Sequence, residues 1–443
     1  MRDRFPFRIP SAALVLVALV AACSSAPGDP KGETSDVRSA STNATVPEPS
    51  ASATPMPGAT PFETSGQRIG IGSPRGGSFH VQGVYPWSPS RCVRPDRPSL
   101  DARYPGALSI RAADDGTLTV TVTISFREYL EGIAEVPPTW PRAALEAQVI
   151  AARSYVLSRT GWSGVEGAAL DDPICATSDC QVYGGIPRPA PPGIERWYRA
   201  VRDTQGQVLL FGDRPADTVY SSTSNGRTYG NEDIFGSSPL PYLRPIVERH
   251  DGASPLSRWR VELPFDDLAT MLRAAGSWSG SAPISSAVVD GSTIRLAGGG
   301  DRRTLDASGL RDAVNTWAPC LLPRRYPSGG LPVSIPSGWF SLSAGSRGLV
   351  VDGRGWGHGV GMVQWGAYGK AVRGWSAGRI LSFYYGGLTP QPYPEPGSIQ
   401  VVAATGLRKL TVDPSRAGAS IDGHELSAGK LHISGGDAVR VSS

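Results

Sequence analysis

The sequence has few methionines, histidines and cysteines, and almost no excess of either charge. Its 443 residues include 4 Met, 5 His and 5 Cys, and the formal net charge is +4. The first 22 residues hold three arginines and one aspartate, so removing them leaves +2. Heptads, a basic stripe and an RNA-binding motif are also missing. These absences exclude a nucleic-acid binder that works through electrostatic attraction.

Glycine and proline are abundant instead, with 54 and 40 residues. Both residues punctuate turns and disfavour helix interiors, so the composition favours strands over long helices. We therefore expect a strand-rich α+β fold with one composite domain over residues 66–398. An inserted α/β piece is predicted at about residues 256–315, where an amphipathic FDDLATMLRAAG precedes strand-like segments, and a small β appendage is predicted over residues 399–443.

The N-terminus has the features of an export signal. Three arginines precede the apolar run SAALVLVALVAA, which is too short to span a bilayer as a permanent helix. The small residues before Cys23, in LVAAC, are similar to a bacterial lipobox, in which the cysteine is lipidated; the alternative is an ordinary signal peptide cut near Ala22. We predict a lipoprotein signal peptide over residues 1–22 and a disordered Ser/Thr/Pro/Ala-rich tether over residues 23–65. The protein is then extracytoplasmic, anchored by lipid to the outer face of the cytoplasmic membrane.

The remaining cysteines are even in number, as expected for an exported protein with disulfides. We predict that Cys175 pairs with Cys180 across a short loop, and that Cys92 pairs with Cys320. The alternative for the close pair is zinc binding, because thiolates are good zinc ligands. No histidine is adjacent to that pair in the sequence, which favours the disulfide.

Two patterns in the first half of the domain predict local structure. Apolar and polar residues alternate on both sides of Asp114–Gly116, which is typical of a hairpin. TWPRAALEAQVIAARSYVLSR is typical of a helix with Thr139 as N-cap and Pro141 in its first turn. Glu135 lies just ahead of this predicted helix, between apolar residues and two prolines. A carboxyl in apolar surroundings has a raised pKa and suits a general acid; the alternative is a surface glutamate in a turn.

The segment GRGWGHGVGMVQWGAYG has glycine at every second position from Gly353 to Gly361. Glycine within a strand often marks the close approach of a ligand or another backbone. We interpret this stretch as an extended segment with one bare face and with Trp356 and His358 on the other. The alternative is a flexible glycine-rich loop.

A second motif, GWSAG at Gly374–Gly378, matches the nucleophile elbow of serine hydrolases. That elbow needs a strand before the serine, whereas AYGKAVR is typical of a helix that Gly374 ends. Ser376 is therefore better explained as the N-cap of the next helix, and a serine hydrolase is a distant alternative.

Four blocks of the sequence resemble, in this order, those of the SpoIID/LytB family of stage II sporulation protein D and amidase enhancers. They are REYLEGIAEVPPTWPRAALEAQVIAARSYVL, CQVYGG, VYSSTSNGRTYGNEDIFGSSPLPYLRPI and GRGWGHGVGMVQWGAYGKAVRGWSAGRILSFYYGG. The resemblance covers roughly residues 105–390. It implies a function in the cleavage or remodelling of peptidoglycan. Stage II sporulation protein D is a lytic transglycosylase that cuts glycan strands without stem peptides, whereas the amidase enhancers assist a separate wall amidase.

The resemblance also implies roles for individual residues. The family's catalytic glutamate lies in a Ser-Glu-Met-Pro motif, which corresponds to Ala134–Pro137 and makes Glu135 the catalytic residue. The family's Gly-Met-Ser-Gln corresponds to Gly361–Gln364, and its Ser-Gly-Gly turn to Ser224–Gly226. Trp356 and His358 would then point into the cleft near Glu135. The implied substrate-binding residues are Ser221, Ser222, Asn225, Thr228, Trp356, His358 and Gln364.

Lytic chemistry needs one carboxyl, whereas ordinary glycosidases use two. Glu135 would protonate the oxygen that leaves C1 of N-acetylmuramic acid and would then deprotonate that sugar's 6-hydroxyl, which gives a 1,6-anhydro product. The alternative is a non-catalytic wall-binding protein that stimulates an amidase. The expected partners are glycan strands, an amidase in that alternative, and the membrane through the lipid. No cofactor is expected, although some family members hold zinc near the cysteine block, and Cys175 and Cys180 match part of that arrangement.

Replacing Cys23 tests the anchor. Cys23→Ser removes the thiol that would carry the lipid, so the protein should move from the membrane fraction to the soluble fraction. Detergent partitioning measures this. A variant that partitions like the parent would rule out the lipobox interpretation.

Overall fold

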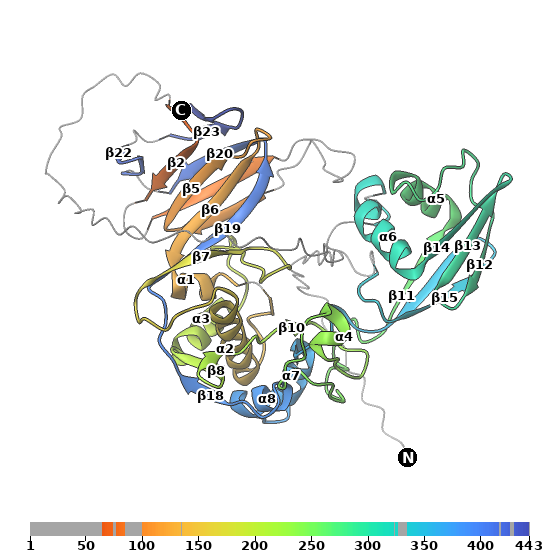
Figure 1. The fold of residues 1–443 in the computed structure, drawn as a ribbon, viewed down its shortest axis with the longest axis horizontal. Helices are drawn as coiled ribbons and strands as arrows, with labels where there is room; N and C mark the ends of the chain where they lie inside the picture. Colours follow the sequence, from red (N-terminus) through yellow and green to blue (C-terminus); the bar gives the residue numbers. More distant parts are fainter. Residues whose placement is uncertain are drawn as a thin grey trace, which may run out of the picture.

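The computed structural model describes residues 64–73, 77–84, 100–133, 135–322, 324–326, 335–415, 418–425 and 429–442. A β-sandwich, a helical layer beside it and a second α/β unit make up this part of the chain (Figure 1). The predicted α+β class is confirmed. Across these residues, no helix has the length and apolar character needed to cross a membrane. The predicted signal peptide, the tether up to residue 63 and Cys23 lie outside the described residues.

Two sheets pack on each other to form the sandwich. The first has the order β22-β21-β2-β5-β6-β19-β7, and the second has the order β1-β24-β23-β20-β3-β4. Contacts of β5 with β24 and of β4 with β6 join the two sheets around one apolar core. Strand β6, LTVTVTIS, shows why the chain folds this way: its apolar residues alternate with threonines and serine, and every second residue is buried.

The strands of the first sheet are β22 (His424–Glu425), β21 (Ser420–Ile421), β2 (Arg68–Gly72), β5 (Ala107–Ala112), β6 (Leu118–Ser125), β19 (Ser398–Leu407) and β7 (Ala169–Cys175). Those of the second are β1 (Thr64–Gly66), β24 (Val439–Ser442), β23 (Leu431–Ser434), β20 (Lys409–Pro414), β3 (Ser78–Val84) and β4 (Leu100–Pro105). All neighbouring strands are antiparallel except β7 and β19, which are parallel.

Two sequence expectations have different outcomes here. The hairpin around Asp114–Gly116 is confirmed, because β5 and β6 pair on either side of it. The C-terminal strands, however, are not an appendage. Residues 399–443 supply strands to both sheets, and Ile399 and Val412 are fully buried in the shared core. The sequence of this segment shows only strands and turns. It does not show that β19 pairs with β6 and β20 with β3, which lie far earlier in the chain.

Helix α2 (Arg142–Arg159) is the centre of the helical layer, and most of its side chains are buried. It contacts α3 (Ile194–Asp203), α7 (Gln364–Val372), α8 (Ala377–Tyr384), β8 (Gln207–Phe211) and β9 (Arg214–Pro215). Strand β18 (Pro390–Pro392) pairs with β8, and α1 (Phe126–Glu131) follows β6 directly. Trp140, just ahead of α2, packs against Trp365 of α7 with ring centroids 4.9 Å apart.

The predicted N-cap of α2 is wrong. Pro141, not Thr139, occupies the cap position, and no side chain caps this end. A proline restricts the preceding residue to extended conformations, so the helix cannot begin before Pro141. Thr139 instead lies in a turn that is closed by a hydrogen bond from Trp140 N to Pro137 O.

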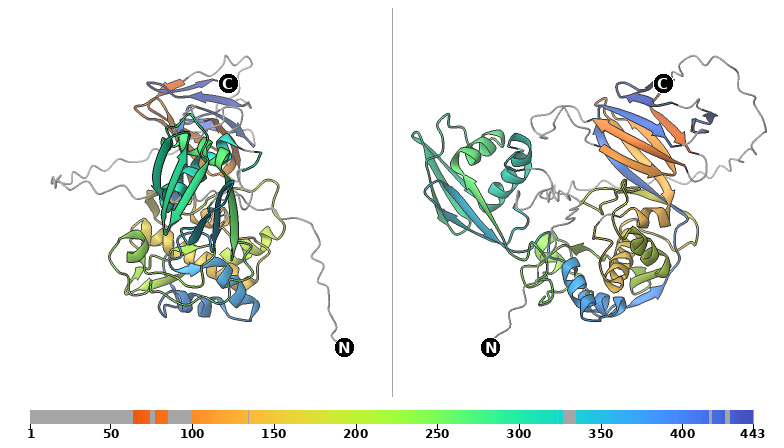
Figure 2. Two further views of the ribbon diagram at one scale, coloured as in Figure 1. Left: turned by 90° about the vertical axis from the view of Figure 1, so that its right-hand side faces the viewer. Right: turned by 180° about the vertical axis from the view of Figure 1, so that it is seen from behind.

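A second hydrophobic core defines the inserted α/β unit. Helices α5 (Phe265–Ala274) and α6 (Ala307–Leu321) cover one face of its strands, as seen from behind in Figure 2. The strands are β11 (Trp259–Pro264), β16 (Gly348–Gly353) and β15 (Phe340–Ala344) in one sheet, and β12 (Ser286–Asp290), β13 (Thr293–Gly298) and β14 (Asp301–Asp306) in another. Buried residues from Leu256 to Val351 form this core, so the unit extends past the expected limit of about 315. The unit reaches beyond residue 315 because β11 pairs with β16, which begins only at Gly348.

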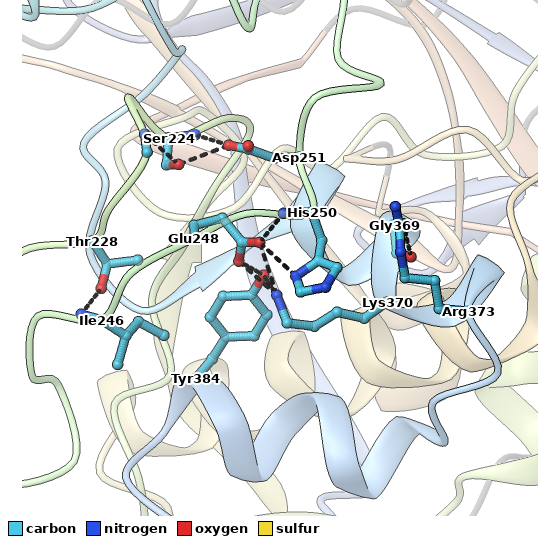
Figure 3. A network of polar contacts seen from close by, with 11 residues as sticks. Ser224, Thr228, Ile246, Glu248, His250, Asp251, Gly369, Lys370, Arg373 and Tyr384 are labelled. Carbon is cyan, nitrogen blue, oxygen red and sulfur yellow. Dashed lines mark hydrogen bonds and ion pairs between the residues drawn. The ribbon is translucent and has the colours of Figure 1, made fainter.

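A buried ion pair holds α7 and α8 to the segment around residue 248 (Figure 3). Lys370 Nζ lies 2.7 Å from Glu248 Oε2, both side chains are fully buried, and the Tyr384 hydroxyl also donates to Glu248. Burial raises the pKa of the Glu248 carboxyl, but Lys370 and the hydrogen bonds hold it below its ordinary value, so the carboxyl stays ionised. Burial in turn lowers the pKa of Lys370. The pair fixes the helix whose first residue is Gln364.

We expect Lys370→Met to destabilise the fold by about 3–5 kcal/mol, because it leaves the Glu248 charge buried without its cation. The double variant Lys370→Met/Glu248→Gln removes both charges and should regain much of that loss. Urea unfolding measures both, and Lys409→Met at an exposed lysine is the control. If Lys370→Met unfolds at the same urea concentration as the parent, the ion pair does not hold this part of the fold together.

Candidate functional site

Glu135 lies in the loop between α1 and α2, which is fixed against residues 181–185. Ile133 pairs with Tyr183, and Gly184 N donates to Gly132 O at 2.8 Å. The Glu135 carboxyl accepts a hydrogen bond from Val182 N at 2.8 Å. The two segments of the chain therefore orient this carboxyl through backbone contacts.

The side chains around Glu135 form a buried polar network. Gln181, which is 1% exposed, donates to the Tyr129 hydroxyl at 2.9 Å and accepts from the Tyr220 hydroxyl at 2.6 Å. Glu135 is close enough to raise the pKa values of the Tyr129, Tyr155 and Tyr220 phenols, which burial already raises. All three phenols therefore remain protonated at neutral pH. They can donate hydrogen bonds but do not act as bases.

Desolvation determines the protonation of Glu135. Burial raises its pKa from 4.5 to about 7, although the hydrogen bond from Val182 N and the nearby Gln364 amide lower it. The residue as a whole is only half-buried, although its carboxyl is desolvated. A carboxyl with this pKa is partly protonated at neutral pH and can both give and take a proton.

Gln364, at the start of α7, lies close to the Glu135 carboxyl. Its amide is close enough to lower the pKa of Glu135, and the residue is 6% exposed. Yet its Nε2 has no hydrogen bond of good geometry to any described residue. Buried amide groups are nearly always paired. A donor left unpaired beside a protonatable carboxyl is suited to an oxygen atom of a ligand.

The glycine segment is neither a strand with one bare face nor a flexible loop. Gly355, Gly357, Gly359 and Gly361 all adopt left-handed conformations, with φ between 69° and 97°. A Cβ on Gly357 would lie 2.9 Å from Ser221 Cβ, and one on Gly361 would collide with Val219 O. The regular spacing therefore reflects a backbone that turns at every second residue while it packs closely against residues 219–224.

This packing joins β10 (Tyr220–Ser221) to β17 (Met362–Val363) as a parallel pair, with Tyr220 opposite Met362. Gly359 N donates to Ser221 Oγ at 3.2 Å, and Trp365 N donates to Ser222 O at 3.0 Å. The parallel pair places the start of α7 next to the strand that carries Tyr220. It thereby brings Gln364 and Glu135 together.

His358 is held by its own backbone surroundings. Its Nε2 donates to Tyr220 O at 2.8 Å, and its Nδ1 accepts from Val360 N at 3.1 Å. Burial lowers the pKa of His358 to about 4, against the effect of the bond to Tyr220, and the positive charge of Arg159 adds to this lowering. The imidazole is therefore neutral, and both nitrogens are already paired. Only the face and edge of the ring remain for a ligand.

The other predicted binding residues make mainly structural contacts. Thr228 is buried and bonds to the backbone of Ile246 and Arg244. Asn225 donates to the Tyr229 hydroxyl at 2.7 Å, and its buried Oδ1 has no partner among the described residues. Trp356 packs against the core of the second unit, and its backbone pairs with Thr223. No contact links these three side chains to Glu135 within the described ranges.

The cysteines and the serine motif can be placed as well. Cys175 and Cys180 are joined by a disulfide, with Cα atoms 5.6 Å apart, which leaves no thiolates for zinc in this state. Cys320, in α6, is disulfide-bonded, while Cys92 lies outside the described residues, so their pairing stays a prediction. Ser376 Oγ accepts from Arg379 N at the start of α8, and Gly374 is left-handed after α7, which confirms the helix-cap interpretation.

Sequence reasoning missed Gln181 and the phenols of Tyr129, Tyr155 and Tyr220. Gln181 directly follows the disulfide in CQVYGG, and this position beside Cys180 was the available signal. The tyrosines come from α1, α2 and β10, which are remote from one another in the sequence. Only the fold brings them together.

The geometry can be compared with known proteins. The family model described as stage II sporulation protein matches residues 114–211, and stage II sporulation protein D of Bacillus subtilis is 27% identical over 287 residues. That alignment covers 60% of this chain and 74% of the relative. Over this region the chain is similar to the SpoIID/LytB family. The matched segment includes Glu135, α2 and Val182, whereas β10 and the glycine segment follow it.

Two further relatives extend this comparison. The amidase enhancer of Bacillus subtilis is 25% identical over 299 residues, which are 58% of this chain and 39% of the enhancer. An uncharacterized protein of Brachyspira hyodysenteriae is 28% identical over 291 residues, which are 64% of this chain and 71% of that protein. The family thus includes proteins with different names and lengths around a shared region.

The raised pKa of Glu135 has a consequence for stability. The folded chain holds this proton up to about pH 7, whereas an unfolded glutamate releases it near 4.5, so stability falls as the pH rises between these values. Glu135→Gln carries no charge and should therefore be more stable than the parent at pH 8, by up to about 3 kcal/mol, with no gain at pH 4. Urea unfolding at the two pH values measures this. Glu425→Gln, at an exposed carboxyl, should show no such gain. Equal gains at both pH values would contradict the desolvated state of Glu135.

Proposed function

We propose that this protein acts on peptidoglycan glycan strands as a lytic transglycosylase, with Glu135 as its single acid and base. The observation that carries the proposal is the desolvated Glu135 carboxyl, held by Val182 N, with a pKa of about 7. A group that must first donate and then accept one proton works best when its pKa lies near the pH of the reaction. Glu135 meets that requirement without a metal or a second acid.

In the proposed reaction, protonated Glu135 gives its proton to the glycosidic oxygen while the bond from that oxygen to C1 of N-acetylmuramic acid breaks. The carboxylate then takes the proton of the 6-hydroxyl of the same sugar, and O6 bonds to C1. The products are a 1,6-anhydro end and a new 4-hydroxyl on the neighbouring sugar, and Glu135 regains its proton. Val182 N orients the carboxyl through its hydrogen bond. The unpaired Nε2 of Gln364 is available to a sugar oxygen.

The surroundings of Glu135 support a mechanism with one carboxyl. The groups that shift its pKa, besides burial, are Val182 N and the Gln364 amide, and no carboxylate is among them. Enzymes that hydrolyse glycosides mostly use two carboxyl groups, either to activate water or to form a covalent intermediate. A sugar's own hydroxyl replaces the second group in the proposed reaction.

A second candidate function follows from one of the relatives. Because the chain is similar to a protein named amidase enhancer, a non-catalytic role in stimulating a wall amidase is the alternative. In either case we propose that the protein works outside the cytoplasmic membrane, that Cys23 carries the lipid anchor, and that glycan strands are the ligand.

The deciding experiment uses the mature protein and peptidoglycan with and without stem peptides, followed by mass analysis of the sugars. The parent should release 1,6-anhydromuramic ends, and Glu135→Gln should reduce turnover by about 10²–10⁴-fold while still binding glycan. Turnover should also fall as the pH rises through about 7, because Glu135 then loses the proton it donates. Suppose that the parent releases no anhydro sugar yet stimulates an amidase, and that Glu135→Gln stimulates it equally. The catalytic proposal is then wrong and the enhancer role is correct.

A further inference from the structure

The short helix α4 (Asn231–Phe235) carries two exposed apolar side chains that the fold does not use. Ile234 is 38% exposed and Phe235 is 45% exposed, whereas Asn231 is the only residue of α4 that is buried. Adjacent exposed apolar groups can mark a binding surface, whereas single ones are common on protein surfaces. Phe235 is therefore a candidate for contact with a ligand.

Polar contacts tie the first two residues of α4 to the segment that follows the helix and so hold the helix that carries Phe235 in place. Asn231 Nδ2 donates to Ser238 O at 2.7 Å, and Asn231 Oδ1 accepts from Leu240 N at 2.9 Å. Arg244 donates two hydrogen bonds to Glu232, at 2.6 and 2.8 Å. A rigid aromatic group loses little conformational freedom when a ligand binds to it.

The Phe235 ring lies against His358, with ring centroids 5.2 Å apart and planes tilted by 55°. Both nitrogens of His358 are paired with the backbone, and the imidazole is neutral. Together the two rings form an uncharged aromatic surface. His358 bonds to Tyr220, and the Tyr220 hydroxyl bonds to Gln181, the neighbour of Val182, which binds the Glu135 carboxyl. A chain of hydrogen bonds through Tyr220 and Gln181 thus connects His358 to the segment that holds Glu135.

We infer that Phe235 and His358 form a subsite that stacks one pyranose ring of the glycan strand next to the sugars bound at Glu135. The inference rests on the proposed function. A pyranose has one face made of C–H groups, which packs on a neutral aromatic ring, while its hydroxyls stay in water. A glycan long enough to reach beyond Glu135 then gains contact area that a shorter one does not.

The experiment measures binding, so that catalysis does not interfere. In the Glu135→Gln background, calorimetry compares denuded glycan strands with an N-acetylglucosamine tetramer. Adding Phe235→Ala should weaken the binding of long strands by about 3–10-fold, the usual worth of an aromatic contact. Phe235→Trp should restore it. Thermal unfolding should be nearly unchanged, since the side chain is half-exposed.

The chain offers a matched control. Phe211 is 48% exposed, and its ring lies 5.1 Å from the Tyr242 ring, with planes tilted by 49°. Phe211→Ala therefore removes the same apolar group from a similar setting, and glycan binding should not change.

The outcomes separate the two proposals. If the Glu135→Gln parent binds long strands and Phe235→Ala binds them equally well, the subsite is refuted while the proposed function stands. If the parent binds no glycan of any length, both fail. If Phe235→Ala leaves glycan binding intact but abolishes stimulation of an amidase, the surface contacts a protein, and the stacking subsite is again refuted.

Discussion

The arrangement of the site depends on the close approach of two backbone segments, the glycine segment and residues 219–224, which include β10. A side chain at Gly361 would collide with Val219 O, so the approach is possible only because the glycines leave space on this side. Their left-handed conformations let the chain turn at each second residue. The same approach sets the register of β10 against β17, which in turn places Gln364 beside Glu135 and His358 beside Tyr220. The backbone conformation of the glycines thus determines which side chain lies beside the Glu135 carboxyl.

Two buried polar groups in this protein illustrate opposite uses of burial. The Glu248 carboxyl is fully buried, but Lys370 and Tyr384 satisfy it, so it stays ionised and holds α7 and α8 in place. The Glu135 carboxyl has only Val182 N and the nearby Gln364 amide, and its pKa rises to about 7. The first arrangement favours the charge and serves the fold. The second disfavours it, which costs stability and leaves a proton that can be transferred.

Patterns that depend on neighbouring residues were predictable from the sequence, whereas long-range pairings were not. The hairpin around Asp114–Gly116 and the Ser376 cap are determined by local residues, and both are confirmed. The C-terminal strands looked like an appendage because their partners precede them by hundreds of residues. Glu135 was identified from its apolar flanks and the family resemblance. Gln181 gave too weak a signal, since its importance comes from bonds to Tyr129 and Tyr220 on other elements.

The distribution of protonation states limits which reactions this site can support. Among Glu135, the Tyr129 and Tyr220 phenols and His358, Glu135 is the group that changes its charge near neutral pH, because the phenols stay protonated and His358, with a pKa of about 4, stays neutral. Neither the phenols nor the neutral His358 supplies a second base. In the proposed lytic reaction, the proton that Glu135 gives to the leaving group is recovered by the same carboxyl. A hydroxyl of the sugar would fit this proposal, since binding would position it beside the bond that breaks.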